Sequence, residues 1–339
     1  RKLKHAFRLT YKWWKKNNLE LYSSGPYWKY KNNRTISEIK KHGLNNFRGI
    51  NTSIGTSFSD NLILDVRNEF NIKGRIVGKI FSLPILSKIF KAQLKQNENN
   101  IKSYIDNQGI VYRNDTNVLN LINKYKFENT TAFNCVKKFQ YLDKEYSTHY
   151  LEMVNRIDKL SSLFNYKKIN SFFEIGGGFG ANIHSLISNF PNIKKIVYLD
   201  IVPNIYVGTE YLRFHYKDKV KDYLSFKNLN QISFSDDNEL EILCIPPWAI
   251  ERLNVKIDHF HNASSFVEMP VAVIKNYCKY IKKLETKDIS LISYDKFDLK
   301  TSLDPTILNN YFDNKLKISW KETLIKEYDR KDVYLTSNW

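Results

Sequence analysis

A glycine-rich turn directly after an apolar run constrains the fold of this chain more than any other feature. Residues 172–175 are Phe-Phe-Glu-Ile, and they lead into a turn with glycines at Gly176, Gly178 and Gly180. Glycine adopts positive φ angles and has no Cβ, so such a turn lets a ligand lie against the backbone. The sequence therefore predicts a buried strand that ends at a ligand-binding turn.

The residues after the turn complete a pattern that is typical of nucleotide-binding folds. Residues 183–190 have apolar side chains at helical spacing, and a second apolar run over 196–199 ends in Asp200. A strand, a glycine turn, a helix and a strand ending in a carboxylate form the nucleotide-binding half of an open α/β sheet. In that arrangement we expect Asp200 to accept hydrogen bonds from ribose hydroxyl groups.

The glycine spacing alone leaves the class of nucleotide open. A dinucleotide fingerprint that starts at Gly176 ends at Ala181, which is a permitted variant, so NAD is one alternative. A turn that only packs a helix against a strand is another. Glu174 precedes the first glycine by two residues and suits the cationic methionyl group of S-adenosylmethionine (SAM) better than a pyrophosphate. Gly180 gives the glycine spacing of class I methyltransferases. These two residues favour SAM.

The composition indicates a globular chain with enough apolar residues for a core. Of its 339 residues 42% are hydrophobic, which is sufficient for one large domain or two ordinary ones. No apolar run reaches the roughly 18–20 residues that span a bilayer, and no signal-peptide pattern is visible. Three widely spaced cysteines, Cys135, Cys244 and Cys278, favour a reducing compartment over a disulfide framework. We therefore expect a cytoplasmic protein.

The net charge of +18 is compatible with several anionic partners. The lysines are scattered along the chain rather than clustered, so the charge does not favour nucleic acid. An acidic or lipid-linked acceptor near a membrane surface fits the charge better, and it allows peripheral membrane contact. Residues 74–91 carry apolar side chains at helical spacing among lysines, which is compatible with a membrane-surface helix or, as we favour, a core helix.

The pattern of the chain changes near residue 145. Residues 1–145 are predicted to form a mainly helical region, in which aromatic residues such as Trp28 alternate with lysines. This region is a candidate acceptor lid, glycan platform or dimer surface. Residues 146–339 are predicted to form a Rossmann-like SAM-binding domain.

The order of elements after residue 145 predicts a particular sheet. The expected strands are 171–175, 196–199, 241–245, 255–261 and 289–294, followed by 316–324 and 333–337. Helices are expected after the first, second and fourth of these strands, and the last two runs form an antiparallel hairpin. This is the order of the class I methyltransferase sheet, whereas a dinucleotide-binding domain continues with parallel strands.

Residues 257–270 contain the second group of candidate site residues. Ligands of open α/β sheets bind beyond the carboxyl ends of the strands, so residues 262–268 are expected to face the reactive end of the cofactor. Methyl transfer to a hydroxyl needs a group that takes the proton, and Glu268 and His261 are candidate bases. Each has a structural alternative: Glu268 as a carboxylate at a helix N-terminus, and His261 as a core or surface residue beside His259.

The same stretch contains residues that suggest other chemistry. Alternation along the strand places Asp258 on the opposite face from His259 and His261, so no metal site is predicted. Ser264 and Ser265 lack the Gly-x-Ser-x-Gly context of a nucleophile, and they are candidates for contacts with the substrate.

Together these residues resemble a family of sugar O-methyltransferases from bacterial surface-polysaccharide gene clusters. The matching elements are Glu-Ile-Gly-Gly-Gly-Phe-Gly at 174–180, Asp200, Asp258, Asn262 and Ser-Phe-x-Glu-Met at 265–269, with weaker matches at 26–28 and 46–48. The Asn…Ser-Phe-x-Glu-Met element is the more specific one, because very many methyltransferases share the glycine motif. The fifth strand of that family tends to be followed by an Asn-Arg pair, whereas residues 293–296 are Ser-Tyr-Asp-Lys.

The resemblance implies SAM as the methyl donor. It implies a sugar hydroxyl as the acceptor, on a surface glycan or on its nucleotide- or lipid-linked precursor. The residues expected at the cofactor are Glu174, Gly176, Gly178, Gly180, Asp200, Trp248 as a wall for the adenine, and Asn262.

Three alternative functions remain at this point. A nucleic-acid methyltransferase would use an Asn-Pro-Pro-Tyr element to hold a flipped base, but residues 245–248 are Ile-Pro-Pro-Trp. A nicotinamide-dependent oxidoreductase or epimerase is disfavoured, because the sequence has no Tyr-x-x-x-Lys pair near the site. A non-catalytic scaffold with the same fold, or a homodimer, is compatible with the sequence.

Overall fold

The computed structural model describes residues 20–25, 43–49, 105–294, 305–313, 315–322 and 332–337, together with isolated residues between 28 and 103. The chain forms two compact units, one made of residues 1–36 and 152–339 and the other of residues 37–151. The predicted boundary at 145/146 therefore lies close to the second junction. The first 36 residues, however, belong to the larger unit and not to a separate N-terminal region.

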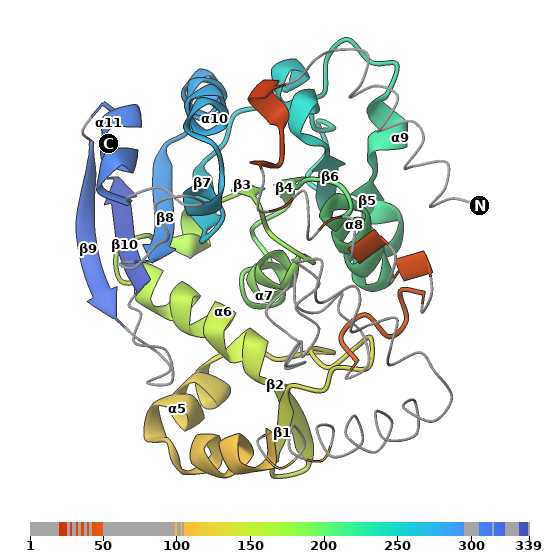
Figure 1. Ribbon diagram of the computed structural model, residues 1–339, viewed down its shortest axis with the longest axis vertical. Coiled ribbons are helices and arrows are strands. Elements are labelled where there is room, and N and C mark those ends of the chain that lie inside the picture. The colour runs from red at the N-terminus through yellow and green to blue at the C-terminus, as the bar shows by residue number, and fades with distance from the viewer. Residues whose placement is uncertain are drawn as a thin grey trace, which may run out of the picture. The chain divides into compact units, whose positions relative to one another are not determined.

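An eight-stranded sheet forms the centre of the larger unit (Figure 1). Its strands are β3 (Ser171–Ile175), β4 (Lys195–Leu199), β5 (Val220–Lys221), β6 (Glu241–Ile245), β7 (His259–Ala263), β8 (Asp288–Tyr294), β9 (Leu316–Glu322) and β10 (Asp332–Ser337). The spatial order is β5-β6-β4-β3-β7-β8-β10-β9. Strands β3 to β8 all run parallel to one another, and β10 is antiparallel to both β8 and β9. This is the class I methyltransferase sheet that the order of elements predicts, with the short β5 added at one edge.

Strand β7 begins later than expected. The prediction placed it over 255–261, but pairing starts at His259, opposite Phe172 of β3. The cause is Asp258, whose carboxylate accepts hydrogen bonds of 3.0 Å from the backbone N–H groups of Asn170 and Ser171. These bonds occupy the N–H groups of Asn170 and of Ser171, the first residue of β3, so the pairing of β3 with β7 begins at Phe172.

One face of the sheet packs against helix α10 (Val271–Lys283), helix α11 (Pro305–Tyr311) and the short 3-10 helix η5 (Pro247–Arg252). Residues of β3, β4, β6, β7, β8 and β10 contribute apolar side chains to this cluster. Both faces of the central strands are covered, which is why β3, β4 and β6 are buried at every position and contain few polar residues. Each fully buried large apolar side chain contributes about 1.5–3 kcal/mol to folding.

The opposite face is covered by α6 (Thr148–Leu160), α7 (Ala181–Asn189) and α8 (Asn204–Tyr216). Arg156 of α6 donates a 3.0 Å hydrogen bond to the carboxylate of Asp332 at the start of β10. Asn182 of α7 bonds to Glu174 of β3, and Gly208 of α8 packs on Tyr198 of β4. These contacts place polar side chains under the glycine turn, where the site is expected.

Further 3-10 helices connect these elements: η1 (Glu20–Tyr22), η3 (Tyr166–Lys168), η4 (Lys217–Lys219) and η6 (Phe266–Glu268). A one-turn helix, α9 (Tyr223–Phe226), follows β5.

The smaller unit contains a β-hairpin that the sequence analysis did not predict. Helix α5 (Thr116–Lys124) precedes the antiparallel strands β1 (Lys138–Tyr141) and β2 (Lys144–Ser147). Arg48 is fully buried in this unit, and its guanidinium donates to the Thr130 carbonyl at 2.6 Å and to Ser147 Oγ at 2.8 Å. Arg48 thus ties three sequence-distant segments together.

Two expectations about membranes concern different parts of the chain. Residues 74–91, the candidate membrane-surface or core helix, lie outside the described residues. Within the described part of the chain, no helix combines the length and the apolar character needed to cross a bilayer.

Candidate active site

The glycine turn is held against the loop that follows β7. The Gly176 N–H donates a 2.8 Å hydrogen bond to the Leu199 carbonyl at the end of β4. Its φ angle is +76°, and a Cβ at this position would lie 2.2 Å from Ser265 Oγ. A side chain at Gly176 is therefore excluded twice, by backbone conformation and by the neighbouring loop.

Asp200 closes the turn from the end of β4. Its carboxylate accepts hydrogen bonds from the backbone N–H of Gly178 at 2.9 Å and of Ile201 at 2.7 Å. Burial raises the pKa of Asp200 from 3.8 to about 7, and the two backbone bonds offset part of this rise. Each carboxylate oxygen can accept a second hydrogen bond. Asp200 therefore keeps capacity for ligand hydroxyl groups.

Tyr198 supports the turn from below, a role that the sequence analysis did not identify. Its hydroxyl donates a 2.5 Å hydrogen bond to the Gly178 carbonyl and lies 3.3 Å from the Asn204 carbonyl. A Cβ on Gly208 of α8 would lie only 2.1 Å from this hydroxyl, so that glycine makes the space for it. The Gly178 peptide is thus fixed at its N–H by Asp200 and at its carbonyl by Tyr198.

Glu174 is a buried carboxylate with one unsatisfied oxygen. Its side chain is 2% exposed, and Oε1 accepts a 2.9 Å hydrogen bond from the Asn182 amide. Oε2 has no hydrogen-bond partner among the described residues, and it lies 2.7 Å from where a Cβ on Gly177 would be. Burial raises the pKa of Glu174 from 4.5 to about 8; the Asn182 bond lowers it and the nearby Asp200 charge raises it further. A buried acceptor without a partner beside a glycine turn indicates a place for a ligand donor.

Trp248 lies in η5, directly after β6, and β6 pairs with β4. Its side chain is partly buried and packs against the main apolar cluster. Because β4 and β6 are parallel, Trp248 and Asp200 both lie beyond the carboxyl ends of their strands, at the same edge of the sheet.

Asn262 and Ser265 have a structural role that the predictions did not anticipate. The Asn262 amide nitrogen donates to the Ile175 carbonyl at 2.8 Å and to Ser265 Oγ at 2.5 Å. Its amide oxygen accepts a 3.1 Å bond from the Phe266 N–H. The three bonds fix the loop after β7 against the end of β3, and they occupy the amide that was expected to face the cofactor. Ser264 lies in this loop with a φ of +61°, and its N–H bonds to the Ile292 carbonyl.

His261 lies in the core and not at the edge of the site. His261 Nδ1 and His259 Nε2 both contact Ser290 Oγ, at 2.8 and 2.7 Å. Burial, assisted by the positive charge of Arg156, lowers the pKa of His261 from 6.5 to about 3. An imidazole with so low a pKa is a weak base. The structure therefore argues against His261 as the proton acceptor.

Glu268 is half-buried in η6 and contacts the N-terminal segment. Its Oε2 accepts a 3.0 Å hydrogen bond from Trp28 Nε1, across 240 positions of the sequence. The expected alternative, a carboxylate at the N-terminus of α10, does not describe this contact. Sequence reasoning could not find Trp28 as a partner, because only the fold brings the two residues together.

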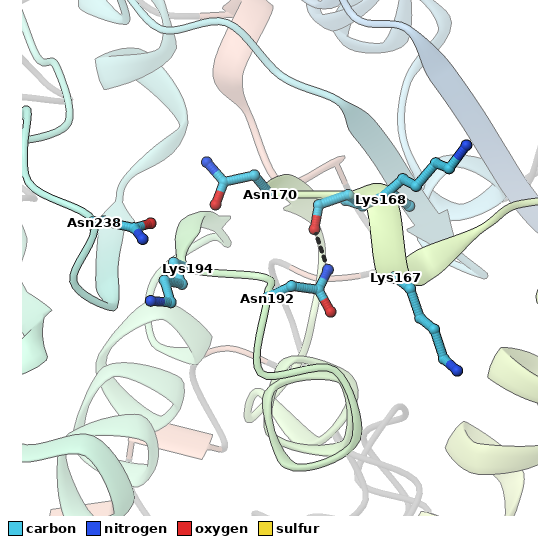
Figure 2. Close-up of a pocket in the computed structure, with 7 residues that line it drawn as sticks. Lys167, Lys168, Asn170, Asn192, Lys194 and Asn238 are labelled. Atoms are coloured by element: carbon cyan, nitrogen blue, oxygen red, sulfur yellow. Dashed lines mark hydrogen bonds between the residues drawn. The ribbon is translucent and has the colours of Figure 1, made fainter.

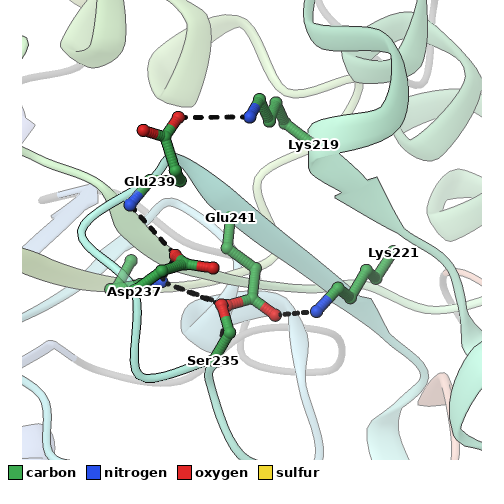
Figure 3. Close-up of polar contacts among 7 residues, drawn as sticks. Lys219, Lys221, Ser235, Asp237, Glu239 and Glu241 are labelled. Atoms are coloured by element: carbon green, nitrogen blue, oxygen red, sulfur yellow. Dashed lines mark hydrogen bonds and ion pairs between the residues drawn. The ribbon is translucent and has the colours of Figure 1, made fainter.

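The opposite edge of the sheet, at the amino ends of the strands, has a different character. Figure 3 shows a network there in which Lys221 and Ser235 contact Glu241 at the start of β6. Lys195 of β4 bonds to Glu241 and to Asp237, at 3.3 and 3.0 Å. Burial favours the neutral form of Glu241, but the bonds from Lys221 and Ser235 outweigh it and lower the pKa. The network fixes the strand ends and leaves no partnerless carboxylate comparable to Glu174.

A shallow pocket of about 390 Å³ lies at the same amino-end edge (Figure 2). Its lining residues are Lys167, Lys168, Ile169, Asn170, Asn192, Lys194 and Asn238. The three lysine side chains point in different directions in Figure 2, so they do not converge on one ligand. Among the described residues, no group of three or more His, Cys, Asp or Glu side chains is arranged to hold a metal ion.

Comparisons with known proteins give a partial likeness in fold. No protein-family model and no curated protein sequence matches the chain. Among solved structures, mitomycin 7-O-methyltransferase MmcR matches 55% of this chain and 56% of its own length at 10% identity, with a TM-score of 0.33. Magnesium protoporphyrin IX methyltransferase ChlM from Synechocystis PCC 6803, with bound SAM, matches 56% of this chain and 80% of its own at 12% identity and a TM-score of 0.35.

Human N-acetylserotonin methyltransferase in complex with SAM matches 56% of this chain and 54% of its own length at 11% identity, with a TM-score of 0.35. The matched part thus spans only about half of MmcR and of the human enzyme. Similarity this low in sequence and in structure bears on the fold alone. The fold itself is established by the strand order and the strand directions described above.

Proposed function

We propose that this chain is a SAM-dependent methyltransferase. The single observation that carries the proposal is Glu174 Oε2, a buried oxygen without a partner that lies beside a fixed glycine turn. In the class I sheet this turn is at the carboxyl ends of the strands, where ligands of open α/β sheets bind. The methionyl amino group of SAM is a cationic donor of the kind that this oxygen lacks.

The residues around the turn fit SAM in charge as well as in place. Glu174 would bind the amino group, Asp200 the ribose hydroxyls, and Trp248 would form a wall for the adenine. A cation beside Glu174 stabilises its ionised form, whereas the pyrophosphate of NAD would be repelled by it. When bound, SAM supplies a methyl group on a sulfonium sulfur, which is a strong electrophile.

Gly176, Gly178 and Gly180 would contribute mainly through the backbone. Gly178 is the member whose peptide is fixed on both sides, and it presents the turn to the ligand. Gly180 is the N-cap residue of α7, and a Cβ there would lie 3.0 Å from Leu212 Cγ of α8. We therefore assign Gly180 to helix packing behind the site.

On the acceptor side, we propose Glu268 as the base. As the acceptor oxygen bonds to the methyl carbon and the bond from that carbon to sulfur breaks, Glu268 takes the hydroxyl proton. Asn262 and Ser265 would act indirectly, because their side chains hold the loop that carries Glu268.

For the acceptor itself, we propose a sugar hydroxyl on a nucleotide- or lipid-linked glycan precursor. The support is the resemblance of the Asn262-to-Met269 element to sugar O-methyltransferases, together with a net charge of +18 that favours phosphate-bearing acceptors.

Calorimetric titration of the full chain with SAM, S-adenosylhomocysteine and NAD tests the cofactor. Binding of the first two without heat from NAD is the expected result. Binding of NAD alone would replace the proposal with an oxidoreductase, and no binding of any of the three would contradict a catalytic role.

Transfer of labelled methyl groups from SAM to UDP-glucose, UDP-galactose, UDP-N-acetylglucosamine and GDP-mannose tests the acceptor class. In the sugar that reacts best, Glu268→Gln should reduce turnover strongly and leave SAM affinity unchanged. His261→Gln should retain turnover in proportion to folded protein. Strong loss of turnover in His261→Gln with full turnover in Glu268→Gln would instead identify His261 as the base.

A further inference from the structure

Tyr22 anchors the N-terminal segment to the helices that pack on the eight-stranded sheet. The Tyr22 side chain is 4% exposed, and its hydroxyl donates a 2.6 Å hydrogen bond to Glu251 Oε1 in η5. Its ring lies 6.3 Å from that of Tyr277 in α10. Burial, followed by the bond to Glu251, raises the pKa of Tyr22, so the hydroxyl remains a donor at physiological pH.

Gly25 then allows the segment to pass closely over the loop before α10. Its φ angle is +65°, and a Cβ would lie 3.1 Å from Pro270 Cδ and 3.3 Å from Pro270 Cγ. A side chain at this position would strain the backbone and push the segment away from the loop that contains Glu268.

Trp28 makes the contact that matters most for chemistry. Its indole N–H donates to Glu268 Oε2 at 3.0 Å. A hydrogen bond to an ionised carboxylate is about twice as strong as one between neutral groups, and it fixes the direction of the acceptor oxygen. Trp28 therefore orients the carboxylate of the candidate base.

Asn32 follows Trp28 by four positions in the sequence, and the backbone is helical at both residues. The Asn32 side chain is 9% exposed, yet its Oδ1 has no hydrogen-bond partner among the described residues. A buried carbonyl oxygen without a donor indicates a place for a ligand hydroxyl.

We infer that Trp28 and Asn32 contribute to the acceptor side of the methyl-transfer site. In this inference Trp28 is the positioning residue for Glu268, and Asn32 binds a hydroxyl of a polyhydroxylated acceptor. The inference rests on the proposed function. It places residues of the acceptor side more than a hundred positions before the SAM-binding motif in the sequence.

The first test needs no acceptor. In full-length protein labelled with ¹⁵N-tryptophan, the indole signal of Trp28 is identified by its loss in Trp28→Phe. Glu268→Gln should move that signal, because the charged acceptor is replaced by a neutral one. The indole signals of the other tryptophans are the internal control and should move less than that of Trp28. An unmoved Trp28 signal would overturn the positioning role.

The second test separates positioning from binding by kinetics with the reactive nucleotide sugar. Trp28→Phe should lower kcat about tenfold with little change in acceptor KM or SAM affinity. Asn32→Ala should instead raise acceptor KM about tenfold. In a Glu268→Gln background, Trp28→Phe should cost less than about twofold, because the contact is already weakened.

The outcomes distinguish the inference from the proposed function. Loss of SAM binding or of folded protein in Trp28→Phe would mean a purely structural role and would overturn the inference, as would additive losses in the double variant. Wild-type protein that binds no SAM would contradict the proposed function instead. If SAM binds and none of the four sugars reacts, the indole signal decides the positioning role.

Discussion

Replacement of Glu174 by glutamine should change how the stability of the protein depends on pH. In the folded protein the pKa of Glu174 is about 8, against an ordinary value of 4.5. Between these two values the unfolded chain has released the proton and the folded protein still holds it. Stability therefore falls as the pH rises through this range, since ionising the buried carboxyl is costly. The amide side chain of the Glu174→Gln variant does not titrate, so the variant should lose less stability.

The size of the difference follows from the shift. At about 1.4 kcal/mol per pKa unit, the rise from 4.5 to about 8 corresponds to roughly 5 kcal/mol. This is an upper limit, because entry of water on ionisation reduces the cost. Near pH 5 the two proteins should have similar stability, since a glutamine keeps the oxygen that accepts from Asn182. Near pH 8 the variant should be more stable by up to about 5 kcal/mol.

Urea unfolding of both proteins at about pH 5 and pH 8 measures this difference directly. The raised pKa of Asp200 adds a fall of the same sign, but it is present in both proteins and largely cancels in the comparison. The variant should also bind SAM at least about tenfold more weakly, because the charged partner is gone. Parallel stability profiles for the two proteins would refute the burial argument for Glu174.

Three further predictions concern the same turn. SAM binding near pH 7 should release up to about one proton per site, since the cation drives Glu174 to ionise; titrations in buffers of different ionisation enthalpy measure it. Gly176→Ala should lower the unfolding temperature and abolish SAM binding, because its Cβ would lie 2.2 Å from Ser265 Oγ. Tyr198→Phe should weaken SAM binding several-fold by freeing the Gly178 carbonyl, and unchanged affinity in calorimetry would exclude that role.

The sheet and the cofactor turn could be predicted because their signals are local. Apolar runs alternating with helical periods predict strand order in an α/β chain, and glycine spacing with a following carboxylate predicts the turn. The burial of His259 and His261 in the core could not be predicted from local patterns. Strand alternation places His259 and His261 on one face, but burial follows from neighbours such as Phe164, whose ring lies 4.7 Å from that of His259.

The side chains that complete the site required the tertiary structure. Tyr198 reads as an ordinary strand residue, and only the packing of α8 shows that its hydroxyl supports Gly178. Asn262 was expected in the loop beyond the fourth strand, but it lies within β7 and its amide bonds to the protein's own backbone. The link between Trp28 and Glu268 joins residues too far apart in sequence for any local pattern to connect them.

The grouping of residues 1–36 with residues 152–339 has a consequence for synthesis of the chain. The segment that carries Tyr22 and Trp28 leaves the ribosome early, yet its docking surfaces on η5, η6 and α10 are made more than two hundred residues later. Closing such a long loop is slow, whereas residues 37–151 can become compact beforehand. We therefore expect nascent chains that end before α10 to keep this aromatic segment accessible to chaperones, and synthesis of α10 to complete the surface on which the segment docks.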